Sequence, residues 1–303
     1  MSEFKMLDPM LNHRLLDQHS HAIINRIRHP EVPFGLRAIS LVPKGFEPQE
    51  RLFPWLVPLG NRAIGSSAKT DLLNEIDRLS GGDGRDRTSL EAPSVVMLLA
   101  CDIDDVSLMR NLASRLIVAL PDGSRAMLRW HDPEVLMQLQ WMVNAGSLNN
   151  LLAPIRRISF WLAGHWYSLT PRGGRVSSIL RMDENEIVQL SRIGMINQVL
   201  KETGWSTIDE LTGTSKRIDV AITRAVQVHG LVREEDLVAF ATHAMTVHSR
   251  FDEHPRIARL LSEVKARRLE QDPQTYFDAS AMLTTTAWRD VAAQIQLAGS
   301  TNS

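Results

Sequence analysis

The hydrophobic and polar positions between Ala92 and Val143 predict a strand, a helix, a hairpin and a second helix in close succession. A continuous apolar run, Val95–Ala100, has the length of a buried strand. Apolar residues then recur at helix spacing from Val106 to Leu116. This segment therefore predicts a compact α/β nucleus around which the rest of the first half is organised.

The predicted hairpin depends on the pair Asp122-Gly123, which separates the apolar runs 116–120 and 126–130. An Asp-Gly pair between apolar runs is a strong hairpin signal because both turn residues can take positive φ. The second helix is expected to begin at Pro133, since proline suits the first helical position and Asp132 is a good N-cap.

Four more stretches of the first half carry strand or loop patterns. Residues 36–42 are rich in β-branched residues and predict a strand. Residues 53–59 hold two prolines, which indicates an edge strand in which Trp55 anchors the core. The dipeptide Ala163-Gly164 separates two further strand-like runs and predicts another hairpin. Residues 1–29 are polar and predict a solvated N-terminal arm.

From Asp183 onward the pattern is helical. Asp183 is expected to cap the first helix, and the capping box from Thr207 to Glu210 precedes a short helical segment. Asp252 is expected to cap a further helix. A last helix is expected from Tyr276 to about Leu297.

The change of pattern divides the chain into two lobes. A stretch rich in glycine and arginine between residues 171 and 182 interrupts the strands. The predicted fold class is α+β, with a mixed N-terminal α/β lobe of strands and hairpins over residues 1–178. An all-helical C-terminal lobe is expected over residues 179–303.

Composition narrows the class of protein. The chain has 303 residues, and its 34 basic and 35 acidic side chains leave a net charge of −1, which argues against nucleic acid or anionic membrane as a partner. The single cysteine, Cys101, allows no disulfide within the chain and is expected to be a small buried hydrophobe. No apolar run approaches the roughly 18 residues that span a bilayer. We therefore expect a cytoplasmic protein.

Candidate chemistry is sparse. His131-Asp132 resembles the adjacent ligands of metal phosphohydrolases, but that chemistry needs further ligands and Asp132 already has a capping role. The adjacent acids Asp104 and Asp105 are explained by capping, and no G-x-S-x-G motif is present. The sequence therefore predicts neither an enzyme nor a cofactor, with a metal-dependent hydrolase using His131 and Asp132 as the alternative.

Several motifs together resemble a known family. In order, these are FPWLVPL at 53–59, the apolar strand up to Cys101, and LIVALPDGSRAMLRWHDPEVL at 116–136. The order is similar to that of the type VI secretion adaptor family, the Tap or TEC proteins, whose signature is a strand ending in Arg-aromatic-aromatic-Asp-Pro. Here His131 replaces the usual second aromatic residue. The signature positions are Trp55, Arg129, Trp130, Asp132 and Pro133.

The resemblance implies a non-enzymatic adaptor and chaperone of the cytoplasm. Such proteins bind a toxic effector protein and load it onto the VgrG spike of the secretion machine. The resemblance further implies that the N-terminal lobe is shared within the family and that the helical lobe is associated with the choice of cargo. Because binding partners are usually anchored by aromatic side chains, Trp205, Phe251 and Trp288 are the candidate partner contacts.

Overall fold

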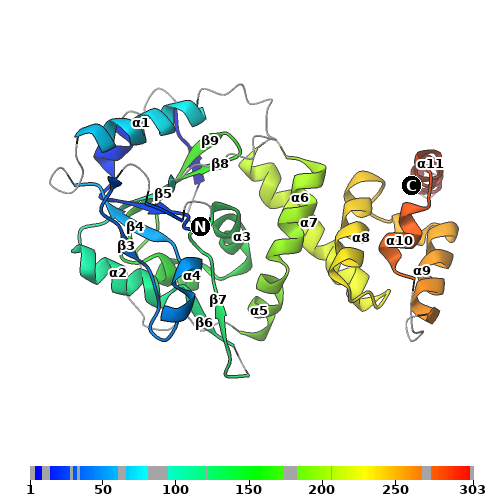
Figure 1. The fold of residues 1–303 in the computed structure, drawn as a ribbon. Helices are drawn as coiled ribbons and strands as arrows, with labels where there is room; N and C mark the ends of the chain where they lie inside the picture. The colour runs from blue at the N-terminus through cyan, green and yellow to red at the C-terminus, as the bar shows by residue number, and fades with distance from the viewer. Residues whose placement is uncertain are drawn as a thin grey trace. The chain divides into compact units, whose positions relative to one another are not determined.

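The computed structural model separates the chain into two compact units, Met1–Ile187 and Val188–Ser303. Strands lie in the first unit and the second unit is helical, which confirms the α+β class (Figure 1). The expected boundary between residues 178 and 179 lies outside the described residues. The structure describes residues 4–8, 14–27, 30–32, 35–60, 66–80, 95–120, 122–173, 183–205, 207–267 and 274–300.

A seven-stranded antiparallel sheet forms the centre of the first unit. Its strands in spatial order are β1 (Phe4–Met6), β9 (His165–Leu169), β8 (Arg157–Leu162), β5 (Val95–Ala100), β2 (His21–Ile24), β4 (Trp55–Pro58) and β3 (Ile39–Ser40). The predicted strand β5 is confirmed, and all six of its residues are buried. A strand covered on both faces needs no polar alternation, which explains its continuous apolar run.

Two expectations for the edges of this sheet are wrong. The polar segment 1–29 is not a solvated arm, because β1 and the fully buried strand β2 come from it. The strand β4 is not an edge strand, because it pairs with β2 on one side and β3 on the other. The predicted strand 36–42 shrinks to Ile39–Ser40, which pairs only with Trp55 and Leu56. Pro58 therefore leaves no gap in the ladder with β3.

Helices cover both faces of the sheet. Figure 1 shows α1 (Ser66–Ser80) on one side and α2 (Asp105–Ser114) and α3 (Pro133–Met142) on the other. Leu72 and Ile76 of α1 belong to one buried cluster with Ala22 of β2 and Leu98 of β5. The sheet is thus an internal layer, and the short helix α4 (Ala145–Leu152) follows α3.

Both predicted hairpins form, with different turns. Between β8 and β9, Ala163 and Gly164 take φ values of 47° and 86°, as a two-residue turn requires. The strands β6 (Ile117–Ala119) and β7 (Arg125–Met127) make a separate two-stranded sheet. Of the described residues in that turn, Gly123 alone has positive φ, so the expectation for Asp122 is wrong. The turn is longer than two residues, since the Leu120 N–H donates to the Ser124 carbonyl.

The helical pattern of the second half is confirmed in outline. Asp183 caps α5 by accepting from the Glu186 N–H at 2.8 Å. The helices are α5 (Glu184–Ser191), α6 (Ile193–Thr203), α7 (Ile208–Gln227), α8 (Glu234–Thr246), α9 (Pro255–Arg267), α10 (Tyr276–Ala281) and α11 (Thr285–Ser300).

Three details of the helical half differ from expectation. Thr207 caps α7 as predicted, but the segment after it is a 20-residue helix and not a short one. The last predicted helix is two helices, because the Thr284 hydroxyl accepts from the Ala287 N–H and starts α11 anew. Asp252 does not cap α9, which begins at Pro255; its carboxylate is buried and ion-paired.

Candidate functional site

The signature residues Arg129 to Pro133 form the joint between β7 and α3. Trp130 and Pro133 are buried, and Asp132 is confirmed as the N-cap because its Oδ1 accepts from the Glu134 N–H at 3.0 Å. The other carboxylate oxygen of Asp132 lies 3.6 Å from the exposed guanidinium of Arg129. The signature segment from Arg129 to Pro133 therefore has a structural role in the first unit.

We expect Asp132→Ala to lower the free energy of unfolding by about 1 kcal/mol, because the first turn of α3 loses its side-chain acceptor. Urea denaturation followed by tryptophan fluorescence measures this loss. Arg129→Ala is the matched control, since it removes the exposed ion pair and keeps the cap, and it is expected to cost less than about 0.5 kcal/mol. Equal losses in the two variants would contradict the capping role.

His131 is buried beside this cap. Burial lowers its pKa to about 3, and no described residue forms a hydrogen bond with its Nδ1. Within the described ranges no three His, Cys, Asp or Glu side chains are grouped to hold a metal ion. The carboxylate of Asp132 is already engaged by a backbone N–H and by Arg129. The geometry thus offers no support for a metal-dependent hydrolase at this pair.

Trp55 packs against the main apolar cluster and is half-buried. The guanidinium carbon of Arg26 lies 3.9 Å from the centre of its ring, in a cation–π contact. Arg26 in turn donates to the Ser40 hydroxyl at 2.9 Å and to the Glu50 carboxylate at 2.8 Å. Arg26 therefore connects Trp55 to β3 and to the 3-10 helix η4 (Glu47–Leu52) that precedes β4.

The three candidate partner contacts differ in accessibility. Phe251 is fully buried, so its assignment as an accessible contact is wrong. It begins the turn η5 (Phe251–Glu253), and its ring lies 4.8 Å from that of Phe240 in the core. Trp205 and Trp288 are half-buried, and Trp288 stacks on His243 with ring centres 4.1 Å apart. Of the three candidate contacts, Trp205 and Trp288 are the two that present surface to a partner.

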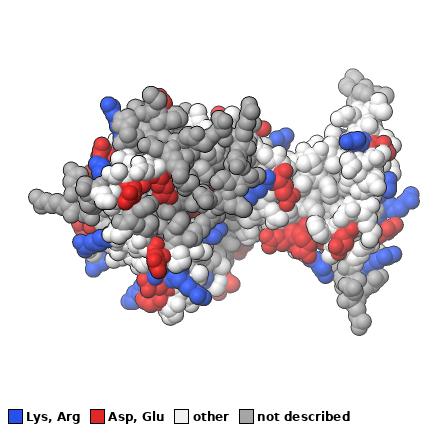
Figure 2. All heavy atoms as spheres, turned by 45° about the horizontal axis from the view of Figure 1, so that its top comes forward, with Lys and Arg blue, Asp and Glu red and all other residues white. Residues whose placement is uncertain are grey.

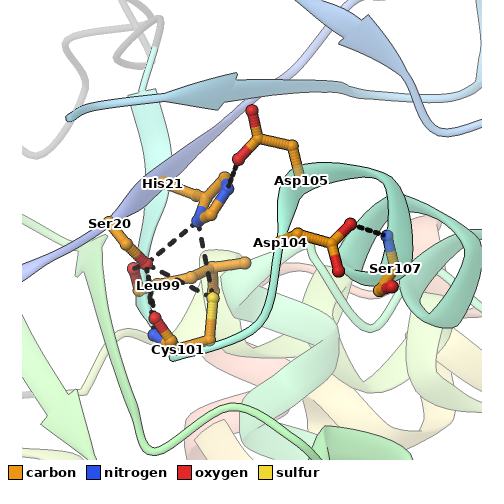
Figure 3. Close-up of polar contacts among 7 residues, drawn as sticks. All are labelled: Ser20, His21, Leu99, Cys101, Asp104, Asp105 and Ser107. Carbon is orange, nitrogen blue, oxygen red and sulfur yellow. Dashed lines mark hydrogen bonds and ion pairs between the residues drawn. The ribbon is translucent and has the colours of Figure 1, made fainter. Parts of the chain in front are cut away.

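The structure brings together a polar cluster that the sequence did not indicate, formed by Ser20, His21, Cys101 and Asp105 (Figure 3). His21 Nε2 lies 3.1 Å from Asp105 Oδ1, at the start of α2. On its other side, His21 Nδ1 lies 2.9 Å from the Ser20 hydroxyl and 3.4 Å from Cys101 Sγ. The cluster lines a cavity of about 360 Å³.

The order thiol, imidazole and carboxylate is that of a nucleophilic triad, but the electrostatics oppose that chemistry. Burial raises the pKa of the Cys101 thiol and lowers the pKa of His21. Both groups are then neutral at neutral pH, whereas a nucleophilic cysteine needs the thiolate. The carboxylate and the sulfur also lie against opposite nitrogens of one ring, so they cannot bind the same metal ion. The cluster is best understood as a clamp between β2, the end of β5 and α2.

We expect His21→Leu to lower the free energy of unfolding by about 1 kcal/mol, because the imidazole contacts to Asp105, Ser20 and Cys101 are lost while Ser20 and Cys101 keep their hydrogen bonds to each other. Chemical denaturation measures the change. Asp105→Asn is the control, since its side chain is 45% exposed and water can replace the bond. A His21→Leu variant as stable as the wild type would show that the clamp does not stabilise the fold.

Comparison with known proteins gives one match. The model of a family described as a domain of unknown function (DUF4123) matches residues 22–149. The matched stretch runs from β2 into α4, and it contains the signature residues and both Cys101 and Asp105. Neither the curated proteins nor the solved structures yield a match. Among the described helices, none is long and apolar enough to cross a membrane.

Proposed function

We propose that this protein is a non-enzymatic adaptor of the type VI secretion system. In this proposal it binds a toxic effector protein in the cytoplasm and loads it onto the VgrG spike. The observation that carries the proposal is the family match over residues 22–149. It covers the three stretches that resemble the type VI adaptors, and the matched domain of unknown function is the family to which that resemblance points.

The charge distribution supports a protein partner over a nucleic acid. Figure 2 shows Lys and Arg side chains interspersed with Asp and Glu on the face drawn, with no extended basic surface among the described residues there. Nucleic-acid binding generally requires such a surface. This agrees with the net charge of −1.

The helical unit supplies accessible apolar groups for cargo. Met282 is 76% exposed, Leu297 68% and Val220 67%. Apolar side chains that are exposed in the free protein gain binding energy when a partner covers them. Together with the half-buried Trp205 and Trp288, they make this unit the proposed contact for the effector.

Co-expression tests the proposal. The tagged full chain is expected to co-purify with the toxin encoded beside its gene and with the VgrG protein of the same cluster. Trp205→Ala and Met282→Asp are expected to lower toxin affinity about tenfold or more, as the loss of an interface anchor does. Val106→Asp is the matched control, because Val106 is 50% exposed on α2 of the other unit. If neither protein associates with the wild-type chain, the adaptor proposal fails.

A further inference from the structure

A second cavity, of about 850 Å³, lies beside the strands β1, β9 and β8 at one end of the sheet. Its lining comes mainly from these three strands and from the residues that follow β9. Lys5, Ser168 and Ser159 stand opposite one another across β1, β9 and β8. Because cross-strand partners share a face, these three side chains form one row. All three line the cavity.

The described lining is basic and contains no carboxylate. Lys5, Arg157 and Arg172 contribute three positive charges, and none of the three forms an ion pair with a described residue. Arg157 donates to the Gln18 side chain at 2.9 Å, which holds its guanidinium over the cavity. Unpaired cations around a pocket attract an anionic group.

Ser159 is the second, independent sign of a ligand. Its side chain is fully buried at the lining of the cavity, and its hydroxyl has no hydrogen-bond partner among the described residues. Buried hydroxyls are rarely left unpaired, because the lost hydrogen bond costs free energy. A polar ligand atom in the cavity would satisfy this hydroxyl.

The outer edge of β1, with which no described strand pairs, indicates the form of the ligand. The Leu7 N–H donates to the Trp166 carbonyl at 2.8 Å, and this sets the alternation along β1. The backbone groups of Phe4 and Met6 therefore point away from β9, and no described residue pairs with them. Such an edge accepts one more extended strand.

We infer that the first unit binds an extended acidic peptide segment of a partner protein, whose backbone pairs with the outer edge of β1 and whose carboxylates enter the basic cavity. Leu7 and Pro171 add apolar walls suited to the side chains between the carboxylates. A small anion would use the charges but not the strand edge, so the peptide accounts for more of the site. This inference goes beyond the proposed function and does not depend on it.

Fluorescence anisotropy of the full chain tests the inference. The probe is a labelled eight-residue peptide that alternates glutamate and valine, with a glutamine–valine peptide as its neutral match. We expect the glutamate peptide to bind at least about tenfold tighter, and Arg157→Gln to remove about tenfold of that affinity. Arg156→Gln is the control variant, because Arg156 lies next in sequence but pairs with Asp102 outside the cavity, and it is expected to change nothing.

Ser159→Ala separates binding from stability. The variant removes an unpaired buried hydroxyl, so its stability is expected to stay level or rise, while peptide affinity falls about threefold to tenfold. Hydrogen exchange should show the amides of Phe4 and Met6 protected by the glutamate peptide. Equal binding of both peptides, equal effects of the two arginine variants, or absent protection of β1 would overturn the inference. Binding of inorganic phosphate without the peptide would also overturn it, in favour of a small-anion site.

Discussion

Lowering the pH from 7 to 4.5 is expected to destabilise the first unit by about 2–3 kcal/mol through His131 alone. Burial lowers the pKa of this ring from 6.5 to about 3. Between these two values the unfolded chain binds a proton and the folded chain does not. The stability that the neutral ring contributes is therefore complete above pH 6.5, and it is lost progressively as the pH falls below that value.

Urea denaturation at pH 7 and pH 4.5 measures the effect in wild type and in His131→Phe. Phenylalanine cannot titrate, and it restores the second aromatic residue of the signature. We expect the variant to lose about 2–3 kcal/mol less than the wild type over this range, while other groups titrate alike in both proteins. His165→Phe is the matched control, because His165 is exposed on β9 of the same unit. If the free energy of unfolding of His131→Phe fell with pH as much as that of the wild type, His131 would not be the group responsible.

The elements that the sequence predicted well are those decided by neighbouring residues. The strand Val95–Ala100, the cap at Asp132 and the turn at Ala163-Gly164 each depend on a few adjacent side chains and their backbone preferences. Such signals remain readable without knowledge of the fold. The signature segment could be placed at a strand-to-helix joint for the same reason.

The polar clamp could not be predicted, because its parts are distant in the sequence. Ser20 and His21 meet Cys101 across about eighty residues, through the pairing of β2 with β5. The polar residues of segment 1–29 concealed the strand β2. The buried His21 is tolerated there because its imidazole has hydrogen-bond partners, and no local sequence pattern indicates them. The short run from His21 to Ile24, with three apolar residues, was the only local sign of that strand.

Asp252 shows the same limit in the helical unit, where a capping pattern concealed a buried ion pair. Its side chain is 2% exposed, and its Oδ2 lies 2.9 Å from Arg224 Nε and 2.8 Å from His229 Nε2. These contacts tie the turn η5 to the end of α7 and to the residues after it. Glu253, the next residue, also pairs with Arg224, at 2.8 Å, but its side chain is 44% exposed.

We expect Asp252→Ala to lower the free energy of unfolding of the helical unit by about 1.5–3 kcal/mol, because Arg224 and His229 lose the buried carboxylate that they share, while Arg224 keeps its exposed partner Glu253. Glu253→Ala removes a carboxylate from the same arginine in an exposed position, and it should cost about 1 kcal/mol or less. Urea denaturation at pH 7 compares the two variants directly.

The double variant Asp252→Ala with Arg224→Ala measures the coupling free energy between these two residues. If most of the loss comes from the missing contact between Arg224 and Asp252, the double variant will be more stable than the sum of the two single losses predicts. Strict additivity would mean that Asp252 and Arg224 act independently. Similar losses for Asp252→Ala and Glu253→Ala would show that burial does not distinguish the two carboxylates, against the geometry of η5.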